Sequence, residues 1–131
     1  MIGFDTNVLL RLFVEDDLTR CERARGYVER VTTDDLCLIN PIVLSEFAWT
    51  LARKGKKARG EVARLIEEVL SADDLEIVHR SAAEQALASY RRGKADFPDY
   101  FLAHINADLG FSTTVTFDGA ALDSGAFSAV P

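Results

Sequence analysis

Strand-like and helix-like segments alternate along this chain, and this alternation restricts the possible folds more than any other feature of the sequence. The short apolar segments that are typical of strands are Met1–Phe4, Leu36–Ile39, Glu76–Val78, Thr113–Thr116 and Phe127–Val130. Apolar residues recur at helical spacing over Val8–Phe13, Asp17–Val31, Ile42–Leu51, Val62–Leu70, Ser81–Tyr90 and Pro98–Leu109. No hairpin turn joins two neighbouring strands, so we expect parallel strands. The pattern therefore predicts the α/β class, with a parallel sheet covered on both faces by helices.

The size and composition of the chain indicate one globular domain over residues 1–131. The chain has 131 residues, of which 48% are hydrophobic, and this is enough for a real core. No apolar run approaches the roughly 20 residues that cross a bilayer, and the first residues lack signal-peptide features, so we expect a cytoplasmic protein with no membrane segment. Cys21 and Cys37 lack C-x-x-C spacing and are expected to be reduced thiols.

The charge of the chain argues against a surface that binds nucleic acid by overall electrostatic attraction, because the net charge is −6. Local basic stretches remain, namely "RKGKKAR" at Arg53–Arg59 and "RRGK" at Arg91–Lys94. Both contain a glycine and follow apolar periodic segments, so we expect them at exposed helix ends and loops. Cations favour such positions even without a ligand, which is a sufficient explanation for each stretch alone.

Acidic residues lie where ligands bind in parallel sheets, beyond the carboxyl ends of the strands. Asp5 follows the first strand, Glu46 lies just inside the helix after the second, Asp118 follows a late strand, and Asp96 and Asp99 lie at the start of a helix. Most have a local explanation as a cap, a turn residue or a partner of the helix dipole. Glu46 is harder to explain, because its helix is apolar nearly all round. We therefore expect these acids to converge in one pocket.

Such a pocket predicts divalent-metal chemistry. The carboxylates repel one another, and no lysine or histidine in the same segments compensates, so at least one acid should have a raised pKa. Oxygen ligands without cysteine or histidine select Mg²⁺ or Mn²⁺ over Zn²⁺. A carboxylate-held Mg²⁺ that keeps several waters can polarise a phosphate and deliver hydroxide. This favours phosphodiester or phosphoryl transfer.

Four blocks of the sequence resemble a known family. "MIGFDTNVLLR" at the start, "SEF" at Ser45–Phe47, "ADFPDYFLA" at Ala95–Ala103 and "TFD" at Thr116–Asp118 are similar to the conserved blocks of PIN-domain ribonucleases, and most of all to the VapC toxins of bacterial toxin–antitoxin pairs. The order and spacing of the blocks agree over essentially the whole chain. The resemblance implies an α/β/α sandwich with a central parallel sheet, in agreement with the pattern above.

The resemblance also implies roles for the individual residues. Asp5, Glu46, Asp99 and Asp118 would be catalytic and metal-binding, and Asp96 would be an additional pocket acid. The supporting polar residues would be Thr6, Asn7, Arg11 and Thr116. Tyr100 occupies a position where family members often carry a small residue, and a helix-packing role is favoured over one in the pocket. Phe47 is expected in the core, whereas Trp49 fits either the core or an interface.

The function that follows is a Mg²⁺- or Mn²⁺-dependent endoribonuclease, the toxin of a toxin–antitoxin pair. The expected partners are an RNA substrate, a VapB-like antitoxin and a second copy of the chain in a homodimer. The residues that would contact the RNA backbone are Arg53, Lys54, Lys56, Lys57, Arg59, Arg91, Arg92 and Lys94.

Two other classes of function are consistent with parts of the sequence. In an aspartate-based phosphotransferase Asp5 would be the nucleophile, but the usual phosphatase pattern has a second aspartate where this chain has Asn7. A protein-interaction module without catalysis would keep the fold alone. The full set of acids argues against the interaction module, because a fold by itself needs no such cluster.

Overall fold

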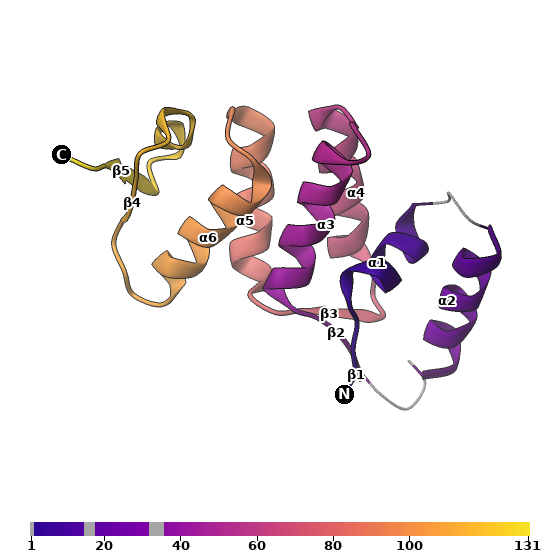
Figure 1. Cartoon of the computed structure of the whole chain (residues 1–131). Helices are drawn as coiled ribbons and strands as arrows, with labels where there is room; N and C mark the ends of the chain where they lie inside the picture. Colours follow the sequence, from indigo (N-terminus) through magenta and orange to yellow (C-terminus); the bar gives the residue numbers. More distant parts are fainter. Residues whose placement is uncertain (1, 15–17, 32–35) are drawn as a thin grey trace.

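The computed structural model describes residues 2–14, 18–31 and 36–131 (Figure 1). Met1 and Asp17, which begin two of the predicted segments, lie outside these residues. The strands are β1 (Ile2–Gly3), β2 (Cys37–Ile39), β3 (Leu75–Ile77), β4 (Thr114–Thr116) and β5 (Phe127–Ala129). The helices are α1 (Thr6–Phe13), α2 (Leu18–Val31), α3 (Pro41–Arg53), α4 (Arg59–Ser71), α5 (Arg80–Arg92) and α6 (Phe97–Asp108). A 3₁₀ helix that the sequence pattern did not predict, η1, spans Gly119–Ser124.

The described strands are all parallel to their neighbours, and the predicted α/β class is confirmed. They form two sheets, where the alternation indicated one. The first sheet has the order β1-β2-β3, with Ile2 opposite Cys37 and Cys37 opposite Leu75. The second contains β4 and β5, with Thr114 opposite Phe127. In Figure 1 this second sheet lies beyond α6, at the opposite end of the molecule from α2.

The position of the second sheet follows from a hydrogen-bond network around a buried tyrosine. Tyr100 is fully buried, and its hydroxyl donates to Asp123 Oδ1 at 2.8 Å while accepting the backbone N–H of Ala95 at 3.1 Å. The N–H of Lys94 donates to Asp123 Oδ2 at 3.0 Å. Only glycine fits at position 93, where a Cβ would lie 2.0 Å from the Tyr100 hydroxyl. These contacts hold η1, and with it β4 and β5, against the turn between α5 and α6.

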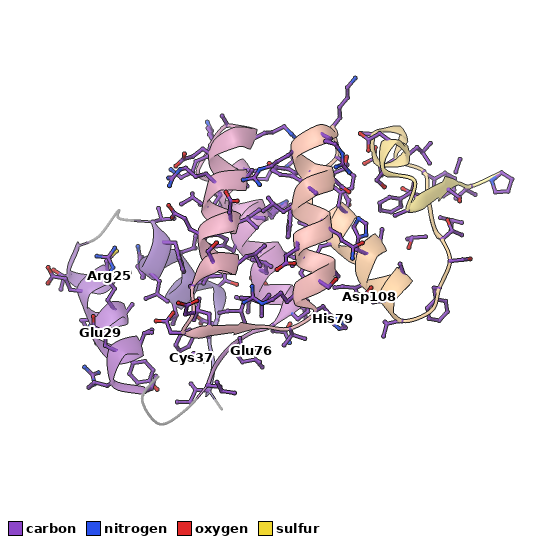
Figure 2. All side chains as sticks on the ribbon, turned by 180° about the vertical axis from the view of Figure 1, so that it is seen from behind. Arg25, Glu29, Cys37, Glu76, His79 and Asp108 are labelled. Atoms are coloured by element: carbon purple, nitrogen blue, oxygen red, sulfur yellow. The ribbon has the colours of Figure 1, made fainter. Side chains whose placement is uncertain are left out.

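The hydrophobic core lies mainly among α3, α4, α5 and α6. Leu44, Phe47 and Ile66 are fully buried there, and Phe97 is only 1% exposed. The expected core position of Phe47 is confirmed, and so is the helix-packing role of Tyr100. Trp49, by contrast, is 47% exposed on α3. Seen from behind, β3 passes below α4 and α5 (Figure 2), and its side chains Leu75 and Ile77 are buried.

Local sequence explains where the helices next to the sheet begin. Asn40 follows β2 and caps α3 by accepting the N–H of Ile42 at 2.8 Å, and Pro41 supplies a fixed φ in the first turn. Asp5 acts in the same way for α1 after β1. In the described part of the chain, no helix combines the length and the apolar character needed to cross a membrane.

Candidate active site

Asp5 lies at the carboxyl end of β1 and is the N-cap of α1. Its Oδ1 accepts the backbone N–H of Val8 at 3.0 Å, and its own backbone is extended. The side chain is exposed. The capping role considered from the sequence is therefore present, and it leaves the carboxylate open to solvent at the strand end where ligands bind in parallel sheets.

Glu46 is joined to the residue after Asp5. Thr6 Oγ1 donates to Glu46 Oε2 at 3.1 Å, which links α1 to α3 across 40 positions of sequence. The helix is apolar nearly all round, as the sequence indicated, but the inference that Glu46 is poorly tolerated on it is wrong, because α3 buries only one side. Glu46 is exposed, on the same side of α3 as the exposed Ile42 and Trp49, so its carboxylate has no burial cost to offset.

A second group of acids surrounds the start of α6. Arg53, at the end of α3, forms a 2.7 Å ion pair with Asp96. Asp99 follows one turn later and is half-buried. Its pKa is raised, first because burial disfavours the charged form and then because Asp96 and Asp118 are negatively charged, while Arg53 acts in the opposite direction. A raised pKa was predicted within the acidic set from carboxylate repulsion; at Asp99 it is present, but burial contributes more than the repulsion does.

Asp118 joins this second group from the end of β4. Its Oδ1 accepts the N–H of Ala120 at 3.0 Å and so caps η1, and its own N–H donates to Thr116 Oγ1 at 2.9 Å. Thr116 therefore fixes the backbone at Asp118, which agrees with the supporting role implied for it. The side chain of Asp118 is exposed, and its charge acts on Asp99.

The contacts of the predicted acids link them in two groups. Asp5, Thr6 and Glu46 form one, while Asp96, Asp99 and Asp118 form the other. Among the described residues, no three acidic, histidine or cysteine side chains are close enough to hold one metal ion.

The donor chemistry nevertheless fits Mg²⁺ or Mn²⁺. Every acid in the two groups offers hard oxygen atoms, and the half-buried carboxylate of Asp99 faces repulsion that a cation would relieve. Because Mg²⁺ commonly keeps several waters, one or two protein carboxylates are enough to hold it. The charges of Asp96 and Asp118 act on Asp99, so a cation at Asp99 would have further carboxylates nearby.

The basic residues divide into those with structural partners and those facing solvent. Arg59 donates to the carbonyl oxygens of Tyr90 at 2.7 Å and Lys94 at 3.3 Å, and its guanidinium lies 4.0 Å from the Tyr90 ring centroid. Arg53 is paired with Asp96, and Arg91 forms a 2.8 Å ion pair with Glu67. The exposed basic side chains of the two stretches also include Lys54, Lys56, Arg92 and Lys94, whereas Lys57 is half-buried.

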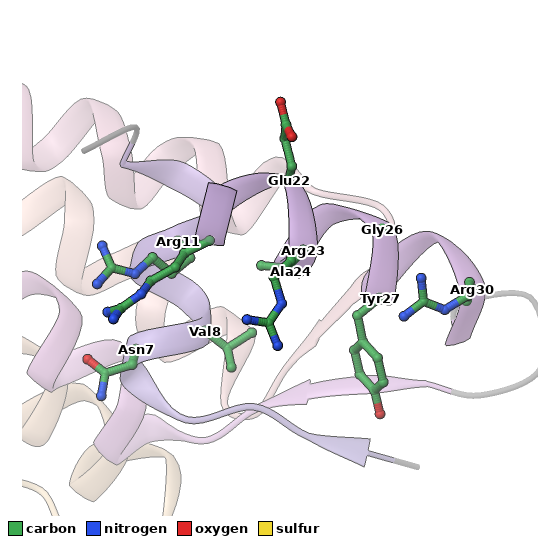
Figure 3. A pocket seen from close by; sticks show the side chains of 10 residues that line it. Asn7, Val8, Arg11, Glu22, Arg23, Ala24, Gly26, Tyr27 and Arg30 are labelled. Carbon is green, nitrogen blue, oxygen red and sulfur yellow. The ribbon is translucent and has the colours of Figure 1, made fainter. Parts of the chain in front are cut away.

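A cleft between α1 and α2 was missed in the sequence. Its volume is about 630 Å³, and Asn7 and Arg11 line it from α1 (Figure 3). The lining residues on α2 include Arg20, Arg23, Tyr27 and Arg30. Their spacing of three, four and three residues places them on one face of a helix, and this was the signal available in the sequence.

These features define an α/β protein with acidic residues at the carboxyl ends of parallel strands. The PIN domain family model matches residues 2–124, and the chain belongs to the PIN domain family. PIN domains are generally nucleases and typically use divalent metal ions. No curated protein sequence matches this chain.

Proposed function

We propose that this protein is a Mg²⁺- or Mn²⁺-dependent endoribonuclease that acts in the cytoplasm as the toxin of a VapC-type toxin–antitoxin pair. The observation that carries the proposal is the environment of Asp99. In a member of a nuclease family, this half-buried carboxylate has a pKa raised by burial and by two neighbouring acids. A bound divalent cation would stabilise the charged form of this carboxylate, as expected for a metal-binding acid.

Each residue of the site has a role under this proposal. When bound, the cation would polarise the scissile phosphate and activate water. One or two of the acids Asp99, Asp118, Asp5 and Glu46 would bind it directly, and the others would bind the waters that it keeps. Thr6 restricts the orientation of Glu46 through its 3.1 Å hydrogen bond. Arg53 neutralises Asp96, which reduces the negative potential that Asp99 experiences before a cation binds.

Two exposed apolar surfaces support the proposed protein partners. On α3, Ile42 is 68% and Trp49 47% exposed, on the side that carries Glu46. A VapB-like antitoxin that covered this side would bury apolar surface and block the acid together, which favours this surface for the inhibitor. Val115 within β4 is 62% exposed, and Phe117 just after the strand is 90% exposed. These exposed apolar side chains favour β4 as the contact with a second copy.

The test is cleavage of single-stranded RNA by the purified protein, with the 5′ ends of the products mapped by sequencing. We expect cleavage with Mg²⁺ or Mn²⁺, none with EDTA, and a loss of at least about 100-fold in the Asp99→Asn variant. Asp108→Asn is the matched control, because it removes the same charge from the far end of α6. Full activity in EDTA, or in Asp99→Asn, would refute the proposal. Trapping of a phosphoaspartate without RNA cleavage would instead favour the phosphotransferase alternative.

A further inference from the structure

The cleft between α1 and α2 is lined by guanidinium groups from both helices. Arg11 lies on α1, and Arg20, Arg23 and Arg30 lie on α2. In Figure 3, Arg23 and Tyr27 extend from α2 toward α1 and β1, whereas Glu22 points the other way. Arg23 therefore faces α1 across the cleft while remaining exposed to solvent.

This arrangement differs from that of an ordinary solvated helix face. The apolar contacts of α2 are made by other residues, since Cys21 and Val28 are buried. In a chain of net charge −6, four arginines and one glutamate line the cleft. The cleft is thus a local positive site on an acidic protein.

We infer that this cleft binds the phosphodiester backbone of single-stranded RNA beside the acidic site, an inference that rests on the proposed nuclease function. Guanidinium groups match phosphate oxygens with two parallel hydrogen bonds, and a row of them holds successive phosphates. Tyr27 is 40% exposed, and the Arg30 guanidinium lies 5.8 Å from its ring centroid. An unpaired base that stacks on this ring would replace that contact and leave Arg30 to bind the adjoining phosphate. An acidic peptide would use the arginines but has no use for the ring.

The cleft lies beside the start of α1, where Asp5 is the N-cap. The Tyr27 ring packs against the Phe4 ring at 6.4 Å between centroids, and Phe4 directly precedes Asp5. Asn7, on the other wall, lies two residues after Asp5. A strand held in the cleft therefore leaves it next to the first acid, so the cleft binds the part of the RNA that flanks the cleaved bond.

The experiment measures binding of a labelled single-stranded oligouridine by fluorescence anisotropy in EDTA, where cleavage does not interfere. The test variant is Arg23→Gln with Arg30→Gln. The control is Arg25→Gln with Arg64→Gln, which makes the same change in net charge using one residue of α2 that does not line the cleft (Figure 2) and one of α4. Thermal melting identifies any unfolded variant, and Arg23→Gln alone replaces the double variant in that case.

We expect the test variant to bind RNA about tenfold more weakly than the control, with the slope of log K against log salt reduced by about 1.4. Equal affinities of the two variants would refute the inference, as would an effect confined to binding of a polyglutamate peptide. Failure of the two proposals is distinguishable. A parent that cleaves RNA while the test variant binds like the control refutes only the cleft. A parent that binds through the cleft but never cleaves with Mg²⁺ refutes only the nuclease.

Discussion

At the scale of single residues, two aspartates are central to the candidate site, and the role of each can be tested by removing its charge. Asp5 combines a helix cap with an exposed carboxylate at a strand end. Asp99 is half-buried and close to other acids. Substitution of Asp5 tests whether one side chain both caps α1 and takes part in catalysis. Substitution of Asp99 tests whether the acidic site lowers the stability of the folded protein.

Substitution of Asp5 by asparagine and by alanine should separate its two roles. Asparagine caps helices as well as aspartate does, so Asp5→Asn should change the free energy of unfolding by no more than about 0.5 kcal/mol, whereas Asp5→Ala should lose about 1 kcal/mol. Both variants should lose RNA cleavage if Asp5 belongs to the metal site. Urea denaturation and cleavage assays on the same samples give the two readouts. Equal destabilisation by both changes would contradict the cap, and cleavage by Asp5→Asn would remove Asp5 from the site.

The stability contributed by Asp99 should depend on pH in a defined direction. Because its pKa is raised in the folded protein, the native state binds more protons than the unfolded chain in the interval above the ordinary value of 3.8. Its contribution to stability therefore falls as the pH rises through that interval, and the penalty is fully present at pH 7. Asp99→Asn should be more stable than the parent at pH 7, with a difference that shrinks toward pH 4. Urea midpoints at pH 7, 5 and 4 test this, and a gain that grows on acidification would contradict it.

At the scale of elements, one short basic stretch contains residues with different roles. Arg59, at the start of α4, bonds the end of α5 and the following loop through two carbonyl oxygens. Lys54 and Lys56, only a few residues earlier, are exposed. Sequence alone treats all three as equivalent charges. The structure instead assigns Arg59 to the contact between α4 and α5.

Arg59→Gln should therefore lower the free energy of unfolding by about 1 kcal/mol, through loss of the hydrogen bonds and the contact with the Tyr90 ring. Lys54→Gln with Lys56→Gln should change it by less than about 0.5 kcal/mol. Urea denaturation measures both. If these lysines touch the RNA backbone, the double variant should also show a weaker salt dependence of RNA binding. A lysine variant as unstable as Arg59→Gln would contradict the division of roles.

At the scale of the whole molecule, the division of the parallel strands into two sheets leaves uncovered edges. Parallel sheets are ordinarily covered on both faces, and unpaired strand edges are sites of association. In the described part of the chain, β1 pairs only with β2, and β4 pairs only with β5. Gly3 in β1 is exposed, with open space around its Cα. In the proposed homodimer, the open edge of the second sheet would be the contact with the second copy.

Charges placed on β4 should then convert a dimer into a monomer. We expect Val115→Lys with Phe117→Lys to reduce the mass in solution from that of two chains to that of one, since buried lysines would oppose the contact. Leu102→Lys, at an exposed leucine on α6, is the control and should leave the mass unchanged. Light scattering after size-exclusion chromatography gives the masses. A parent that is monomeric at all concentrations, or a test variant that remains dimeric, would show that β4 is not the contact.

The sequence by itself determined the class of fold, the order of the strands and helices, and the blocks that match the family. Periodicity and capping are local, and Asn40, Pro41 and Asp5 act within one turn of their own helices. The long-range arrangement was decided only in the tertiary structure. Thr6 donates a hydrogen bond to Glu46 across 40 positions of sequence, and Arg53 pairs with Asp96 across 43. Asp123 binds Tyr100 and holds the second sheet beyond α6. Such pairings depend on how the helices pack, and no local pattern encodes that geometry.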